Sequence, residues 1–250
     1  MIGRSALCRR TVVAVAGLAV VARLAASEPS KTPDAAESLA RLKAGNARFV
    51  ADPGEPLPID MARRTALAQG QTPFASVLSC ADSRVPPEIV FHTGLGDLFV
   101  VRAAGHVADR AVLASLEYGA EHLHIPLIVV MGHETCGAVK AAVETPATKS
   151  LGPNLDYLLK AIRPAVARAA SEPEAARLRA AILSNVEETV NALLERSTVL
   201  KQLAASGEIG LVGGYYELAS GRVIFSEPVT VPVGLSRAES KDRIHAPNAK

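Results

Sequence analysis

The chain has 250 residues, and 49% of them are hydrophobic, which is enough for one large domain with a sizeable core. Its formal net charge is only +2, and the basic residues are scattered along the sequence. A nucleic-acid-binding protein would show a basic stripe with interleaved aromatic residues, so this class of partner is excluded.

The first residues are typical of an export signal. Arg9 and Arg10 precede an apolar run at 11–22, which is shorter than the roughly 20 residues of a membrane-spanning helix. Small residues at 25–27 offer a cleavage site, so we expect a signal peptide over residues 1–27. The arginine pair indicates the twin-arginine type. We expect an exported protein, periplasmic in a Gram-negative bacterium, with no stable membrane span after cleavage.

The rest of the chain indicates a single domain. Residues 28–34 form a polar, proline-containing linker, and the domain is expected over residues 35–228. The tail at 229–250 is polar and carries no strong pattern. The sequence shows no internal repeat and no second domain.

Apolar runs alternate with helical patterns along this domain. Strands are expected at 73–79, 98–101, 125–131, 208–216 and 223–225. Helices are expected at 34–49, 60–69 and 109–121, and over 155–203 with interruptions near Pro164 and Pro173. This alternation predicts an α/β fold with a mostly parallel sheet flanked by helices.

Two clusters of reactive side chains follow two of the expected strands. Cys80 and Asp82 come directly after the run at 73–79, and His133 and Cys136 follow the longest apolar run. Proteins with parallel sheets place their chemistry at the carboxyl ends of the strands. Zinc binds thiolate, imidazole and carboxylate ligands, usually four of them, so these side chains predict a zinc site.

A disulfide between Cys80 and Cys136 is the alternative. Cys8 lies inside the predicted signal, so cleavage would leave an even pair of cysteines in an exported protein. A disulfide requires neither the histidine three residues before Cys136 nor the Asp-x-Arg beside Cys80. A metal site explains both and is the favoured interpretation.

These clusters resemble the β-class carbonic anhydrases. The resemblance rests on Cys-Ala-Asp-Ser-Arg-Val-Pro-Pro-Glu at 80–88 and Gly-His-Glu-Thr-Cys-Gly-Ala at 132–138, and it extends through 96–102 and into the run at 213–216. It covers roughly residues 37–225. It implies the β-carbonic anhydrase fold, a mostly parallel sheet with an edge strand, and assembly as a homodimer or homotetramer.

The resemblance also implies a role for each site residue. Cys80, His133 and Cys136 would hold one Zn²⁺ per subunit. Asp82 would pair with Arg84 in catalysis and would be the fourth zinc ligand in a closed, inactive form. Small or apolar residues match positions around the substrate pocket, and these are Val85, Gly105 and Gly137.

Two stretches depart from the family pattern. Val77 stands where a bicarbonate-inhibited subgroup carries Trp, which argues against that subgroup's inhibitory site. After Arg102 the family commonly has Asn-Ala-Gly-Asn, whereas this chain has Ala-Ala-Gly-His. The histidine of this stretch, His106, is expected at the pocket rim, where an imidazole with a pKa near neutrality would relay protons to buffer.

The expected function is that of a zinc-dependent carbonic anhydrase, a lyase also called carbonate dehydratase. It would convert carbon dioxide reversibly into bicarbonate and a proton through a zinc-bound hydroxide. Asp82 would accept the proton of that hydroxide while Arg84 keeps Asp82 ionised. Because two thiolates donate more negative charge than two imidazoles, we expect activity that rises into the alkaline range.

Three alternatives stay open. Relatives of the family use the same zinc site to hydrolyse carbonyl sulfide or carbon disulfide. A bicarbonate-binding or sensing module would keep the fold without catalysis, but both zinc clusters and the Asp-Arg pair are intact here. Asp82 and Arg84 could also be an ordinary structural ion pair.

Overall fold

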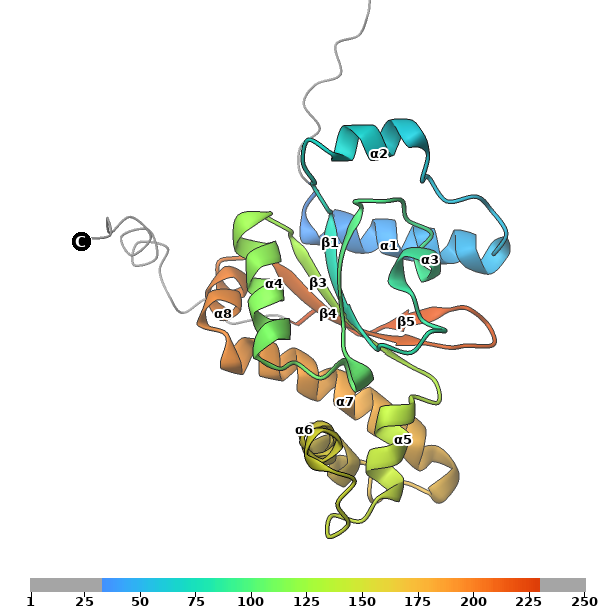
Figure 1. Ribbon diagram of the computed structural model, residues 1–250, viewed down its shortest axis with the longest axis vertical. Coiled ribbons are helices and arrows are strands. Elements are labelled where there is room, and N and C mark those ends of the chain that lie inside the picture. Colours follow the sequence, from blue (N-terminus) through green and yellow to red (C-terminus); the bar gives the residue numbers. More distant parts are fainter. Residues whose placement is uncertain (1–32, 230–250) are drawn as a thin grey trace, which may run out of the picture. The chain divides into compact units, whose positions relative to one another are not determined.

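The computed structural model describes residues 33–229 (Figure 1). The predicted signal peptide at 1–27, most of the predicted linker and all of the predicted tail after Val229 lie outside this range. Within it, every helix is too short or too polar to cross a membrane.

A five-stranded sheet has the order β2-β1-β3-β4-β5. Four strands run parallel, and they are β1 (Ala75–Ser79), β2 (Leu98–Arg102), β3 (Leu127–His133) and β4 (Gly210–Tyr216). The edge strand β5 (Val223–Phe225) pairs antiparallel with β4. The predicted α/β fold, with a mostly parallel sheet and an edge strand, is confirmed. Both β1 and β3 are buried along their whole length, which explains the continuous apolar sequence of β3 and the lack of charged residues in β1.

Helices cover both faces of the sheet (Figure 1). One face packs on α1 (Ala35–Ala51) and α3 (Pro87–Val90), and the other on α4 (Arg110–His122), α7 (Glu174–Arg196) and α8 (Thr198–Ala205). Side chains alternate accordingly, since Val77 belongs to the first layer and Leu78 to the second. The remaining helices are α2 (Met61–Leu67), α5 (Gly137–Glu144), α6 (Pro153–Arg168) and the 3₁₀ turn η1 (Ala104–His106).

The two expected helix interruptions have different outcomes. The break at Pro173 is confirmed, because α7 begins at the next residue. The break at Pro164 is wrong, because α6 continues through this residue. Pro164 removes the hydrogen bond to the carbonyl of Lys160, but both residues are exposed, so water can replace the lost partner. Buried Ile162 and its neighbours hold the helix in place.

One buried side chain ties α1 to two distant segments. Asn46 Nδ2 donates to the carbonyl oxygens of Val90, at 3.0 Å, and Gly221, at 2.8 Å. Its Oδ1 accepts from the Val223 N–H at 2.9 Å. Asn46 therefore gives hydrogen-bond partners to three backbone groups that have none within the helices or the sheet ladder.

We predict that Asn46→Ala lowers the free energy of unfolding by about 2–4 kcal/mol, because it leaves these backbone groups without partners. Urea unfolding followed by circular dichroism measures the change. Asn154→Ala, on the exposed first turn of α6, is the matched control and should shift the value by less than about 0.5 kcal/mol. Similar losses in both variants would contradict the role given to Asn46.

Candidate metal centre

The two reactive clusters meet at the carboxyl end of the sheet. In the strand register, Ser79 of β1 lies beside Arg102 of β2 and Met131 of β3. Cys80 is the residue after β1, and His133 is the last residue of β3. Parallel pairing thus carries side chains that are far apart in sequence to one edge of the sheet.

Cys80, His133 and Cys136 form a buried group, with one possible ligand atom from each within 4.8 Å of the others. The two Sγ atoms are 3.9 Å apart, well beyond a disulfide bond length of about 2.05 Å. Both thiols are free. The structure therefore supports the metal interpretation over the disulfide.

The His133 ring presents one unpartnered nitrogen to this group. Its Nδ1 donates to the Glu134 carbonyl oxygen at 2.9 Å, which leaves the lone pair of Nε2 available. Nε2 is buried and has no hydrogen-bond partner among residues 33–229. A buried polar atom without a partner is costly, and a metal ion in contact with Nε2 would remove that cost.

The two thiols also favour a bound cation. A hydrogen bond with Cys136, helped by backbone N–H groups, lowers the pKa of Cys80 well below its ordinary value against the effect of burial. The N–H groups are those of Gly105, at 3.3 Å, and Asp82, at 3.4 Å. The same thiol–thiolate contact, with burial, raises the pKa of Cys136 well above its ordinary value. Both can be thiolates only beside a positive ion, and two thiolates with one imidazole suit zinc.

Asp82, the fourth predicted ligand, is paired with Arg84 at the edge of this group. Its Oδ2 accepts from Arg84 Nη2 at 2.7 Å, and its Oδ1 accepts from Nε at 2.9 Å. These charge-assisted hydrogen bonds hold the pKa of Asp82 well below its usual range. Oδ2 also lies 3.9 Å from His133 Nε2. The carboxylate is therefore ionised and lies beside the His133 ligand atom, outside the group of three.

Arg102 holds the loop that carries Cys80 and Asp82. Its Nε donates to the Cys80 carbonyl oxygen at 2.9 Å, and its Nη2 to the Asp82 carbonyl oxygen at 2.5 Å. Because Arg102 ends β2, the strand pairing itself places this side chain under the loop.

Thr135, between two of the ligands, has a φ of +53°. This conformation is rare and strained for a β-branched residue. Its Oγ1 lies 3.5 Å from Arg84 Nη1, so the strained turn also brings the second cluster against the Asp82–Arg84 pair.

Gly105 and His106 form a turn behind the metal ligands. Gly105 has a φ of +61°, and a Cβ there would lie 2.9 Å from the Ile162 side chain. Its carbonyl oxygen accepts from Asn185 Nδ2 at 2.9 Å, and the same amide nitrogen lies 2.9 Å from His106 Nε2. Asn185 on α7 therefore fixes the turn whose N–H contacts Cys80.

The expectation that His106 lies at a pocket rim is wrong. Its side chain is completely buried, and burial lowers its pKa to about 4. The turn after β2 folds inward under α7 rather than outward, so the imidazole stays neutral and cannot exchange protons with buffer.

The three predicted pocket residues lie in different environments. Val85 is buried in the core cluster that includes both ligand cysteines. Gly105 donates to Cys80, as described above. Gly137 opens α5 and is exposed, and a Cβ there would meet no atom within 4 Å in the described chain. Packing thus requires glycine at 105 but not at 137.

Three residues that shape the site were not predicted, namely Arg102, Thr135 and Asn185. The first lies within the stretch that carries the family resemblance. Asn185 had a signal in the sequence, because it is a polar residue at a core position of a helical pattern with Val186, Thr189 and Val190. Thr135 had none, because its strain depends on backbone geometry.

Comparisons with known proteins give a consistent result. A family model described as carbonic anhydrase matches residues 75–223. The carbonic anhydrase of Mycolicibacterium smegmatis is 44% identical over 200 residues, which cover 78% of this chain and 94% of that protein. Carbonic anhydrase 2 of Mycobacterium tuberculosis is 41% identical over 189 residues, covering 75% of this chain and 91% of that protein. The solved β-carbonic anhydrase of Coccomyxa aligns with a TM-score of 0.63 at 25% identity, covering 77% of this chain and 86% of that chain.

We predict one tightly bound Zn²⁺ per chain, measured by elemental analysis, and loss of most of this metal in Cys136→Ser. Replacing zinc with cobalt(II) should give thiolate-to-metal absorption bands that the variant lacks. Cys8→Ser keeps both ligand thiols and is the matched control in the full chain. Metal-free Cys8→Ser protein that has no free thiol after denaturation would instead indicate a disulfide between Cys80 and Cys136.

The buried His106 should make stability sensitive to acid. Its pKa is lowered from 6.5 to about 4 in the folded protein, so between these values the unfolded chain binds a proton that the folded chain does not. Stability should therefore fall by about 1.4 kcal/mol for each pH unit as the pH decreases through this window. The variant His106→Asn introduces the asparagine that the β-class pattern commonly has here, and it removes this pH dependence of stability. Asparagine also tolerates the φ of +47° at this position.

Unfolding curves of the wild type and His106→Asn, measured with excess zinc from pH 7 to 5, check this dependence. Metal release affects both proteins alike, so the difference between them reports the histidine. Parallel pH profiles would contradict a neutral buried His106.

Proposed function

The chain belongs to the β-carbonic anhydrase family of lyases, and we propose that it converts carbon dioxide reversibly into bicarbonate and a proton with zinc as its metal. The observation that carries this proposal is the buried group of Cys80, His133 and Cys136 beside an ionised Asp82–Arg84 pair. The unpartnered Nε2 and the two neighbouring thiols supply three ligands for a tetrahedral ion.

Zinc at these ligands would act as a Lewis acid and lower the pKa of water from about 15.7 towards 7. Asp82 would accept a hydrogen bond at Oδ2 from the attacking oxygen and so direct the oxygen's lone pair at the carbon of the substrate. Because the pKa of this carboxyl is well below its usual range, Asp82 stays ionised and orients the nucleophile as a hydrogen-bond acceptor. The hydroxyl hydrogen stays in the bicarbonate product, and the proton lost when water becomes hydroxide would leave for solvent.

Arg84 would keep Asp82 charged and turned away from the metal. The two side chains share a bidentate pair, in which Arg84 is half exposed and Asp82 is largely covered. Solvent screens such a pair, so its contribution is orientation more than net attraction. If Arg84 released it, Asp82 would already be near enough to His133 Nε2 to become the fourth ligand of the closed form.

Export and assembly are part of the proposal. Export is supported by Arg9, Arg10 and the apolar run at 11–22, which are typical of a twin-arginine signal. A homodimer or homotetramer is supported by the resemblance to the β-class enzymes.

Stopped-flow hydration of carbon dioxide across pH tests the main proposal, using protein whose zinc content is known. We expect activity that rises from about pH 6.5 into the alkaline range, because two thiolates make the metal a weaker acid than three imidazoles would. A profile already flat below about pH 6.5 would contradict this.

The same protein can be assayed on carbonyl sulfide and carbon disulfide. We expect carbon dioxide to be the preferred substrate. Faster turnover of a sulfur compound would assign the site to that hydrolysis. Full zinc content without turnover of any of the three would favour a bicarbonate-binding module.

Arg84→Ala separates a catalytic pair from a structural one. We expect full zinc content and a kcat/KM for hydration about 100-fold lower, because Asp82 loses the group that orients it. Arg110→Ala, on the exposed start of α4, is the control and should match the wild type. Wild-type activity in Arg84→Ala would refute the catalytic role.

A further inference from the structure

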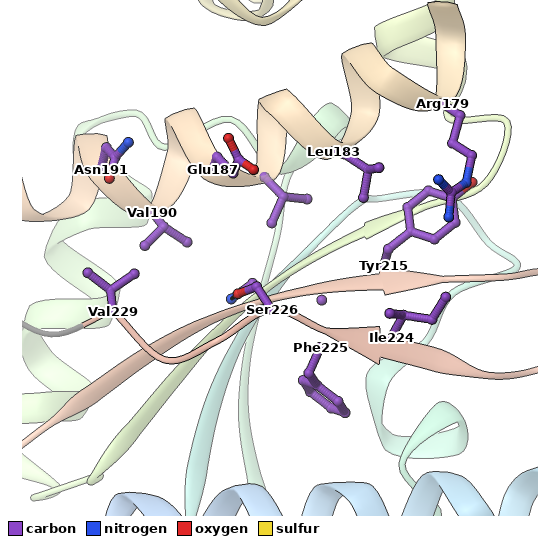
Figure 2. Close-up of a pocket in the computed structure, with 13 residues that line it drawn as sticks. Arg179, Leu183, Glu187, Val190, Asn191, Tyr215, Ile224, Phe225, Ser226 and Val229 are labelled. Carbon is purple, nitrogen blue, oxygen red and sulfur yellow. Dashed lines mark hydrogen bonds between the residues drawn. The ribbon is translucent and has the colours of Figure 1, made fainter. Parts of the chain in front are cut away.

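A cleft of about 350 Å³ lies between α7 and the β4–β5 edge of the sheet (Figure 2). It shares no residue with the metal centre. Leu183, Val186 and Val190 of α7 line it, whereas the Phe225 ring lies on the other face of the sheet, stacked on Phe91. This volume is within the range of small-molecule sites, and these walls suit a hydrocarbon chain or ring.

The positively charged side chain of Arg179 lies at one end of the cleft. Figure 2 shows the Arg179 guanidinium beside the Tyr215 ring, and Arg179 Cζ lies 5.0 Å from the ring centroid. In the part of the chain that the structure describes, no carboxylate forms an ion pair with Arg179. The acidic residue of the cleft, Glu187, pairs with Arg168 at 2.7 Å, and Arg168 also pairs with Glu188 at 2.9 Å. The cleft therefore combines apolar walls with a guanidinium that has no ion-pair partner among the described residues.

We propose that this cleft binds a small amphipathic monocarboxylate. The carboxylate would take two hydrogen bonds from the planar guanidinium of Arg179, which matches its geometry. The hydrocarbon part would lie against Leu183, Val186 and Val190 and be removed from water. A medium-chain fatty acid has both features, and octanoate is the probe.

Isothermal titration calorimetry of zinc-loaded full-length protein with sodium octanoate tests the proposal. We expect saturable binding with one site per chain. Arg179→Gln should weaken it at least about tenfold, because it removes the charge that pairs with the carboxylate. Arg177→Gln is the matched control on the same helix. Arg177 donates to the Glu172 carbonyl oxygen and does not line the cleft, so octanoate affinity should be unchanged.

Ile224→Glu is a second variant at the rim. Ile224 is exposed, so this change should leave the fold intact and should weaken octanoate binding by adding a negative charge. Octylammonium carries the same chain with the opposite charge and should not bind. Acetate carries the charge alone and should not bind at the concentrations where octanoate does.

Several results would overturn the proposal. Octanoate binding that survives Arg179→Gln, or that acetate reproduces, would show that Arg179 does not hold the carboxylate and would refute the proposal. Absence of saturable binding would leave the cleft without this ligand. If Ile224→Glu also changed the oligomeric state in light scattering, a second copy of the chain would be the occupant. None of these measurements depends on carbon dioxide hydration, so the cleft proposal can fail or hold independently of the proposed function.

Discussion

The approach of two buried thiols to 3.9 Å at the end of a parallel sheet is the contact on which this site depends. Two thiolates at that distance repel each other unless a cation lies between them, and His133 adds a nitrogen lone pair at the same place. The surrounding contacts hold these ligands from the backbone. Arg102 binds the loop after β1, and the Gly105 N–H contacts the Cys80 sulfur. Strand register and hydrogen bonds to and from the backbone thus place the candidate ligands next to one another.

Helix α7 is a wall shared by the metal centre and the cleft. On one side, Asn185 holds the turn that contacts Cys80. Val186 packs so closely on β3 that a Cβ at Gly132, the residue before His133, would lie 2.6 Å from it. The next turn of the same helix lines the cleft with Val190. The position of this helix therefore affects both sites. The polar residue on its buried face, Asn185, is explained by its hydrogen bond to the Gly105 carbonyl oxygen.

Much of the fold could be predicted from the sequence because its signals are local. A continuous apolar run marked β3, and Asp34 and Asp109 marked helix starts at which each side chain caps the first turn. Pro164 shows the limit of local rules. A proline usually ends a helix, but the packing of Ile162 and the exposure of the lost carbonyl allow α6 to continue.

By itself, the sequence determined which side chains are candidate metal ligands, because Cys80, His133 and Cys136 are residue types that zinc selects, at spacings that follow two buried strands. Only the tertiary structure decided which groups orient them. Arg102, Asn185 and the inward turn at His106 act across contacts between elements distant in sequence. Their roles depend on burial and on strand register, which side-chain chemistry and local spacing do not specify.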